Sequence, residues 1–554
     1  MLCCLGVMWS QTGGSGIISR QRTLHGASEH AIPRVRRLSH DEQPARSRRF
    51  LVDVEETMRL VLEQEDSDGN FQIHAADSGP KVFALGTEGS GGYRSFEIRG
   101  TYMLSNLLQE LALARDHGQK QIVLDEARLA ENPVDRLSRM IRHSFWSNLT
   151  RRIDADGLEA ICVDSKNRGK NQQPRIYVPE RETRMLEYYR RCAAERPAMG
   201  LLVETLPADF DRHYVKSLND KPGILAIAMR DVTKADGTHD LEGIPFVVPG
   251  ARFNELYNWD SYFVSLGLIT DGHYELAKGI VDHFLFEIKH YKKILNGNRS
   301  YYLMRSQPPF LTDLILQVYN ELDPANEADN HEWLRRGICG AIREYFTVWM
   351  AAPRFDDITG LSRYRPDGLG IPPETEASHF ISVLQPFADK EGVSVNEYID
   401  LYDSGQVSEP KLDEYFMHDR AVRESGHDTT YRFEKRCANL ATVDLNALLY
   451  KYEDDIAAVL ERHFDGSIEI PADDDDADVY EFSAFPFGTE LPVEQGKYDI
   501  SPEWSQPRKS RGERITAAEF RARAQRRKQL ADHYLWHSGH GIVRHRPSFA
   551  PSLR

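Results

Sequence analysis

The sequence predicts a mainly α-helical fold of the α/α-barrel type, and three observations support this. Apolar residues recur at helical spacing in several separate segments, long loops containing Pro and Gly separate those segments, and strand signals are few and short. A helical solenoid would share these features, but the sequence shows no repeat of fixed period. The chain of 554 residues, 41% of them hydrophobic, is long enough for one large domain with appendages.

The helical spacing recurs in four stretches, over residues 104–111, 276–288, 334–346 and 445–456. Gly118 is expected to end the first of these helices, because glycine readily adopts the left-handed conformation that follows a helix. A last helix is expected from Thr516, because Glu519 three residues later completes a capping box. Long loops are expected over residues 296–312 and 360–376.

The charge is distributed unevenly along the chain. Residues 1–49 hold eight Arg and three acidic residues and show no periodicity, which predicts a disordered basic arm. The net charge of the whole chain is −16, so the remainder is strongly acidic, which argues against nucleic acid as a partner. No apolar run of about 18 residues occurs, so no membrane-spanning helix is expected. The six Cys form no CxxC pair, which favours reduced thiols and a cytoplasmic location.

A loop with the spacing of an EF-hand begins at Asp66. Oxygen-bearing side chains stand at its first, third and fifth positions and a carboxylate stands at its twelfth, a pattern that directs several oxygens at one hard cation. The glycine, Gly69, stands at the fourth position where the sixth is usual, and the last residue is Asp77 where Glu is usual. The segment is therefore either a Ca²⁺ site or an acidic turn.

Three further segments combine Arg, carboxylate, amide and aromatic side chains, over residues 249–262, 296–309 and 418–432. A sugar site needs flat aromatic faces for the apolar side of the ring, and charged or amide groups for adjacent hydroxyls. Surface ion pairs are the alternative interpretation of the same composition.

These segments carry a family resemblance. PGARFNELYNWDSYF (249–263) closely resembles the first trehalase signature, with Ala251 where Gly is usual, and NRSYYLMRSQPPF (298–310) and RESGHDTTYRF (423–433) resemble two further trehalase motifs. With the Ca²⁺-like loop, they occur in the order found in fungal neutral trehalases. The resemblance extends from about Arg36 to Trp536.

The resemblance implies an (α/α)6 toroid-type glycosidase barrel that hydrolyses α,α-trehalose to two glucose molecules with inversion of configuration. It implies that Asp428 is the general acid. It assigns substrate contacts to Arg252, Trp259, Asp260, Asn296, Arg305, Ser306, Gln307, Glu374, Arg423 and Gly426. It assigns the Ca²⁺ ligands to Asp66, Asp68, Asn70, Gln72 and Asp77.

The basic arm contains a candidate phosphorylation site at Ser39. Arg36 and Arg37 precede it, and acidic kinase pockets bind Arg side chains at these positions. The resemblance implies that cAMP-dependent kinase modifies Ser39 and that a 14-3-3 protein then binds the phosphate.

The sequence departs from the family after Trp536. The family's general base, a Glu in a Gly-rich loop, and its second signature, with Gly-Trp-Ala-Pro, are expected there and neither is found. We therefore expect a barrel that is incomplete at its C-terminal end, lacks the general base and hydrolyses little trehalose. The alternative is a binding module regulated by Ca²⁺ and phosphate, without catalysis. The expected divisions are a regulatory arm, a Ca²⁺-binding region, the partial barrel and an aberrant tail, over residues 1–49, 50–95, 96–536 and 537–554.

Overall fold

The structure of the chain is a computed structural model, which describes residues 48–162, 173–375, 377–428, 432–470, 481–482, 508–509, 514–537, 542–543 and 546–547. Almost all of the predicted arm, including Ser39, lies outside these residues. The chain divides into two compact units, Met1–Leu137 and Ser138–Arg554. Helix α4 (Pro133–Met140) spans the division in sequence. None of the described helices is both long and apolar enough to cross a membrane.

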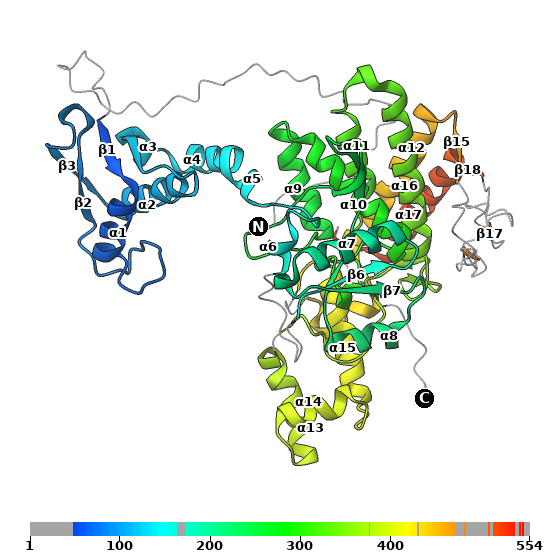
Figure 1. Ribbon diagram of the computed structural model, residues 1–554. Helices are drawn as coiled ribbons and strands as arrows, with labels where there is room; N and C mark the ends of the chain where they lie inside the picture. The colour runs from blue at the N-terminus through cyan, green and yellow to red at the C-terminus, as the bar shows by residue number, and fades with distance from the viewer. Residues whose placement is uncertain are drawn as a thin grey trace. The chain divides into compact units, whose positions relative to one another are not determined.

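The smaller unit combines two antiparallel strand pairs with helices (Figure 1). Its strands are β1 (Arg49–Asp53) with β4 (Gln121–Asp125), and β2 (Val82–Gly86) with β3 (Ser95–Arg99); its helices are α1 (Val54–Glu65), α2 (Thr101–Asp116) and α3 (Glu126–Leu129). The predicted leucines at 104, 107 and 111 are fully buried in its core. Asp53 starts α1 by accepting a hydrogen bond from the Glu56 amide at 3.0 Å, which satisfies one of the free donors of the first turn.

The larger unit is mainly helical. Its helices are α5 (Trp146–Asn148), α6 (Leu158–Cys162), α7 (Thr183–Glu195), α8 (Arg212–Ser217), α9 (Asn258–Thr270), α10 (Tyr274–Tyr291), α11 (Leu311–Tyr319), α12 (Glu327–Glu344), α13 (Ile381–Glu391), α14 (Val395–Asp403), α15 (Pro410–Glu424), α16 (Val443–His463) and α17 (Ala517–Tyr534). A π-helical turn, η7 (Tyr345–Trp349), extends α12. The expected stretches 276–288, 334–346 and 445–456 lie in α10, α12 with η7, and α16, so the mainly α prediction is confirmed.

Strands of the larger unit are short, as expected. Its only described sheet with three strands is parallel and has β6 (Arg175–Pro179) between β7 (Leu202–Leu206) and β8 (Ile224–Leu225). The other described strands form antiparallel pairs: β5 (Thr150–Arg151) with β11 (Phe246–Val247), β9 (Met229–Thr233) with β10 (His239–Gly243), β12 (Phe355–Asp356) with β13 (Leu361–Ser362), β14 (Leu440–Ala441) with β21 (Arg546–Pro547), β15 (Ser467–Glu469) with β18 (Arg514–Thr516), β16 (Glu481–Phe482) with β17 (Arg508–Lys509), and β19 (Trp536–His537) with β20 (Ile542–Val543).

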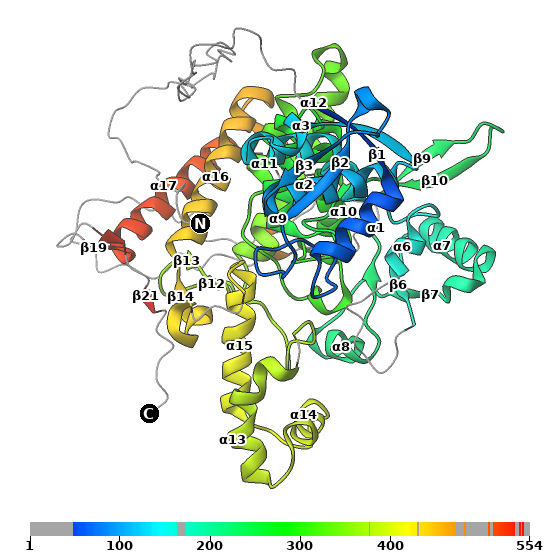
Figure 2. The same ribbon diagram turned by 90° about the vertical axis from the view of Figure 1, so that its left-hand side faces the viewer.

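Helices α16 and α17 lie side by side although about 50 residues separate them in sequence (Figure 2). Thr516 caps α17, because its hydroxyl accepts a hydrogen bond from the Glu519 amide at 3.2 Å. This is one half of the predicted capping box; the Glu519 carboxylate accepts instead from Arg523, at 2.9 Å. Helices α13 and α14 pack beside α15 through a separate apolar cluster that includes Phe380 and Phe416 (Figures 1 and 2).

A layer of buried polar groups lies between α12 and α16. The Tyr452 hydroxyl donates to Glu344 at 2.7 Å, and the Tyr345 hydroxyl donates to Glu453 at 2.6 Å. Arg527 of α17 pairs with Glu453 at 2.8 Å. These groups have almost no exposure, so each hydrogen bond offsets the cost of removing a polar atom from water.

Glu344 is expected to make stability depend on pH. Burial raises the pKa of Glu344 from 4.5 to about 7, so the folded state retains a proton that the unfolded state releases. The free energy of unfolding should therefore be highest below the unfolded pKa and decrease by about 3 kcal/mol as the pH rises through about 7. Denaturant unfolding at several pH values should show a shallower decrease for Glu344→Gln. The control is Glu332→Gln, on the exposed side of α12; an unchanged pH dependence in Glu344→Gln would contradict the assignment.

Candidate active site and calcium loop

The first turn of α9 presents Trp259 and Asp260 beside the loop that contains Asn296 and Gln307. The Trp259 amide donates to Oε1 of Gln307 at 3.1 Å, and the Asn258 amide donates to the Asn296 carbonyl at 3.4 Å. Amides in the first turn of a helix lack partners within the helix, so this loop supplies acceptors that α9 needs. The sequence segments 249–263 and 296–310 are therefore joined by hydrogen bonds through these residues.

Arg305 and Glu374 form a buried ion pair. Their nearest nitrogen and oxygen atoms are 2.7 Å apart, and the two side chains are 7% and 10% exposed. Burial alone would raise the pKa of Glu374, but the positive charges of Arg305 and Arg423 outweigh it and lower that pKa. Arg423 also pairs with Asp419 at 2.7 Å. These charges lie in the interior, so the alternative of surface ion pairs does not describe them.

The end of α15 places Gly426 against the Trp259 ring. Gly426 has φ +78°, and a Cβ added to it would lie 2.3 Å from Cζ2 of Trp259. Glycine is required here for two reasons, since the backbone is left-handed and the ring leaves no space for a side chain. Two residues later, Asp428 is exposed and has φ +39°.

Asp428 lies within electrostatic reach of two other candidates. Burial chiefly, and then the negative charge of Asp428, raise the pKa of Asp260, although a backbone hydrogen bond opposes them. Burial alone would lower the pKa of Arg305, but the charges of Glu374 and Asp428 raise it. The structure therefore brings two carboxylates within electrostatic range of each other, with buried arginines and a tryptophan ring, from three distant segments of the chain.

Two of the candidates have different surroundings. Arg252 is exposed, and its guanidinium lies 4.8 Å from the Phe253 ring centre; within the described part of the chain the structure records no contact between Arg252 and another candidate. Ser306 is fully buried, and its hydroxyl donates to the Ile294 carbonyl at 2.6 Å. That hydroxyl is therefore already engaged by the loop itself.

Three charged residues next to the site were not among the residues predicted from the sequence: Glu424 and Arg354, which are buried, and Lys293, which is half-buried. Glu424 belongs to the segment RESGHD, which could have identified it, whereas Arg354 and Lys293 stand in no motif. Burial, with the positive charge of Arg354, lowers the pKa of Lys293 to about 7. Its ammonium group donates to the carbonyls of Tyr291 and Leu303 at 3.2 and 3.0 Å.

The structure brings three of the predicted Ca²⁺ ligands together. Carboxylate oxygens of Asp66, Asp68 and Asp77 all lie within 4.8 Å of one another. Asp77 accepts hydrogen bonds from the Ser67 and His74 amides at 3.2 and 2.6 Å, and the His74 hydrogen bond is the main cause of its lowered pKa.

The two remaining predicted ligands, Asn70 and Gln72, also offer oxygen atoms that suit a hard cation. Asn70, at the fifth position, donates through its amide nitrogen to Asp68 at 2.9 Å, and the seventh position, Gln72, would supply its backbone carbonyl as in other EF-hand loops. Gly69 and Phe71, at the fourth and sixth positions, both have positive φ, +72° and +61°. The loop therefore turns at its sixth position without the usual glycine. This oxygen donor set suits Ca²⁺, whose charge would offset the repulsion among the three carboxylates.

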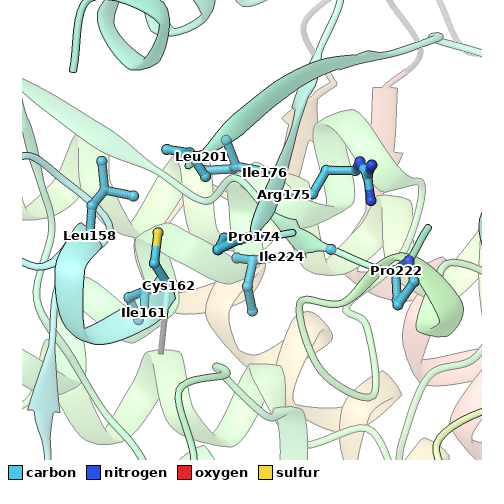
Figure 3. A pocket seen from close by; sticks show the side chains of 10 residues that line it. Leu158, Ile161, Cys162, Pro174, Arg175, Ile176, Leu201, Pro222 and Ile224 are labelled. Atoms are coloured by element: carbon cyan, nitrogen blue, oxygen red, sulfur yellow. The ribbon is translucent and has the colours of Figure 1, made fainter. Parts of the chain in front are cut away.

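A small cavity elsewhere in the larger unit contains none of the candidate residues. Apolar side chains of Ile161, Ile176 and Ile224 surround it, with Cys162 and Arg175 at its border (Figure 3). It lies at the parallel sheet, because β6 and β8 supply part of its lining.

Two family models match the chain. The model described as trehalase matches residues 115–544, and the model described as the neutral trehalase Ca²⁺ binding domain matches residues 58–87. The second match covers the loop that contains the three clustered carboxylates.

Known proteins with similar sequences or structures carry the same description. The cytosolic neutral trehalase of Emericella nidulans is 57% identical over 439 residues, which cover 79% of this chain and 58% of the relative. That of Saccharomyces cerevisiae is 52% identical over 448 residues, which cover 80% and 60%. The solved structure of neutral trehalase Nth1 from Saccharomyces cerevisiae matches with a TM-score of 0.66 and 45% identity, over 76% of this chain and 69% of that chain. The chain thus spans about three fifths of the length of these two relatives.

Proposed function

The chain belongs to the trehalase family, and from this premise we propose that it acts on α,α-trehalose and cleaves the 1,1-glycosidic bond to give two glucose molecules with inversion. The observation that carries the proposal is the convergence of Asp428, Asp260, Arg305 and Trp259 on one site. A carboxyl group, buried cations and an indole face are the groups that protonate a glycosidic oxygen and bind sugar hydroxyls and ring faces.

In this proposal Asp428 is the general acid that protonates the bridging oxygen. Trp259 offers its ring to the apolar face of a glucose unit, and Arg305 is held for hydroxyl recognition by its ion pair with Glu374. The other proposed substrate contacts are Arg252, Asp260, Asn296, Ser306, Gln307, Arg423 and Gly426.

We also propose that none of the described residues is the general base. An inverting enzyme needs an ionised carboxylate that activates water, about 6.5–9.5 Å from the acid. Glu374 and Asp419 are held in ion pairs by Arg305 and Arg423, which weakens them as bases. Asp260 is the one remaining carboxylate among the candidates, and the experiment below tests it directly.

Azide separates the roles of acid and base. Azide can attack C1 from the face opposite the bridging oxygen, the C1–O bond then breaks, and the acid protonates the departing oxygen, which yields β-glucosyl azide and glucose. In α-glucosyl fluoride the leaving group is fluoride, which departs without a proton. The reaction of this substrate therefore does not need the general acid. We expect little glucose from trehalose alone, and formation of β-glucosyl azide from both substrates when azide is added.

Each outcome has a distinct meaning. Rapid trehalose hydrolysis without azide would contradict the proposal about the base, and if Asp260→Asn then made the reaction depend on azide, Asp260 would be the base. No product from either substrate under any condition would contradict the trehalase proposal. It would favour the non-catalytic module, whose Ca²⁺ binding the next experiment measures.

Asp68→Asn is expected to weaken Ca²⁺ binding at least about tenfold, because the number of ligand charges sets the affinity of such loops. Asp68 is exposed, so its replacement leaves the buried Asp77 contacts in place. Calorimetric titration with Ca²⁺ measures the change. The control is Glu63→Gln, an exposed carboxylate of α1 that pairs with Arg59; equal affinities of the wild type and Asp68→Asn would contradict the assignment of the loop.

We further propose that the protein acts in the cytosol, the location given in the names of its relatives, and that Ca²⁺ and phosphorylation regulate it. The proposed phosphorylated residue is Ser39, the kinase is cAMP-dependent, and a 14-3-3 protein binds the phosphate. Kinase treatment should increase azide-supported turnover when the 14-3-3 protein is present, and Ser39→Ala should remove that increase. The same increase in Ser39→Ala would exclude this residue.

A further inference from the structure

We propose that Glu424 is a positioning residue that holds the Ser306 segment and the turn bearing Asp428 in one arrangement. This inference rests on the proposed function, because the two segments it joins carry the proposed substrate contacts and the proposed general acid. Glu424 is the last residue of α15 and is fully buried, so it acts through the groups that it binds.

The Glu424 carboxylate accepts hydrogen bonds from three residues in two other segments of the chain. The Ser306 amide donates to Oε1 at 3.1 Å, and the Arg365 amide donates to Oε2 at 3.1 Å. Arg354 donates through Nε to both oxygens, at 3.1 and 3.2 Å, and through Nη2 to Oε1 at 2.5 Å. One carboxylate therefore joins α15 to the segment that contains Ser306 and to the segment that contains Arg354 and Arg365.

Further hydrogen bonds hold the residues that precede Ser306. Arg354 also donates to the Met304 carbonyl at 3.3 Å, and Lys293 donates to the Leu303 carbonyl at 3.0 Å. The carbonyl of Arg305 accepts from the Asn296 amide at 2.9 Å. Hydrogen bonds therefore fix four consecutive residues, from Leu303 to Ser306. Glu424 is the partner in one of these hydrogen bonds and Arg354 is the partner in another.

On its other side, Glu424 is followed within four residues by the proposed general acid, Asp428. Ser425 follows Glu424 and donates through its hydroxyl to the Val422 carbonyl at 2.6 Å, which closes the last turn of α15. Gly426 then contacts the Trp259 ring, and Asp428 follows two residues later. The position of Asp428 relative to Arg305 and Ser306 therefore depends on a connection through Glu424.

A contribution to stability is a weak explanation for the buried ion pair between Arg354 and Glu424. Burying a carboxylate and a guanidinium costs several kcal/mol per ion, and their attraction often only offsets that cost. A bidentate Arg–carboxylate pair does fix geometry, because two hydrogen bonds restrict both distance and angle. A displacement of about 1 Å between reacting groups can reduce a rate about a hundredfold, so a fixed connection here has a direct consequence for the reaction.

The test compares Glu424→Gln with Glu453→Gln, a control in an equally buried Glu–Arg pair that touches none of the candidate site residues. The first measurement is hydrogen exchange, which requires no turnover. We expect exchange in residues 302–308 and 421–428 to accelerate at least about tenfold in Glu424→Gln and not in the control. Arg354→Lys keeps the positive charge but removes the two-pronged guanidinium that binds both carboxylate oxygens. It should therefore cause a smaller increase in the exchange rate of the same two segments.

The second measurement is azide-supported turnover of both substrates. Glu424→Gln should slow the trehalose reaction about a hundredfold and the α-glucosyl fluoride reaction much less, because only trehalose needs the positioned acid. Unchanged exchange in residues 302–308, in both Glu424→Gln and Arg354→Lys, would overturn the inference. Equal losses with the two substrates would also overturn it. Absence of product from the wild type would contradict the proposed function, while the exchange result would still decide whether Glu424 joins the two segments.

Discussion

Asp428→Asn is expected to reduce the azide-supported reaction of trehalose by about 10²–10⁴-fold, the range that a general acid typically contributes. The amide of Asn cannot give a proton to the bridging oxygen, so the leaving glucose would depart as an unstable alkoxide. The reaction of α-glucosyl fluoride should change little, because fluoride leaves without a proton. A large loss with both substrates would contradict the role of acid and indicate a role in binding.

The backbone conformation at Asp428 allows the substitution to test the side chain without changing the turn. Asp428 has φ +39°, and Asn tolerates left-handed backbone at least as well as Asp, so the exchange should leave the turn intact. Asp465 provides the matched control, since it is also exposed and has φ +49° in the same unit. Asp465→Asn should leave both reactions unchanged.

Gly426→Ala is expected to weaken trehalose binding at least about tenfold and to lower the free energy of unfolding by about 2–4 kcal/mol. The new methyl group would lie 2.3 Å from the Trp259 ring, so either the ring or the turn must move. Both carry proposed contacts with the sugar. Calorimetric titration with trehalose and denaturant unfolding measure the two effects.

Gly466 is the control that measures the cost of placing an alanine at a positive φ without a clash. It has φ +79°, nearly the value of Gly426, and a Cβ added to it would meet no atom within 4 Å. Gly466→Ala should therefore cost only about 1 kcal/mol of stability and leave binding unchanged. Equal effects of the two substitutions would show that the contact with the Trp259 ring contributes nothing.

Part of the fold could be predicted because it depends on local order in the sequence. The apolar spacing over residues 445–456 indicates a helix whatever lies opposite, and α16 contains it. Thr516 caps α17 through a residue three positions away, so that signal is also local. The loop from Asp66 to Asp77 belongs to the same class, because twelve consecutive residues supply its donors.

The candidate site was predictable only as separate motifs. The segments with Trp259, Arg305 and Asp428 were recognised from their residues, and their resemblance to trehalases agrees with the family match. Their mutual arrangement was not predictable, since the pair of Arg305 with Glu374 joins residues that are far apart in sequence. Whether such a pair is buried depends on the surrounding helices, and composition alone had left surface ion pairs as an alternative.

The sequence by itself determined the mainly helical class, the Ca²⁺-like loop and the family motifs, because periodicity and short motifs express interactions within a few residues. Only the tertiary structure decided which charges became buried partners. Glu424 and Arg354 are 70 residues apart, and Glu344 and Tyr452 are 108 apart. Burial raises the pKa of Glu344 and the hydrogen bond from Tyr452 opposes that rise, so this pKa depends on packing between residues that are far apart in sequence. Burial and charge at close range act through space, without regard to separation along the chain.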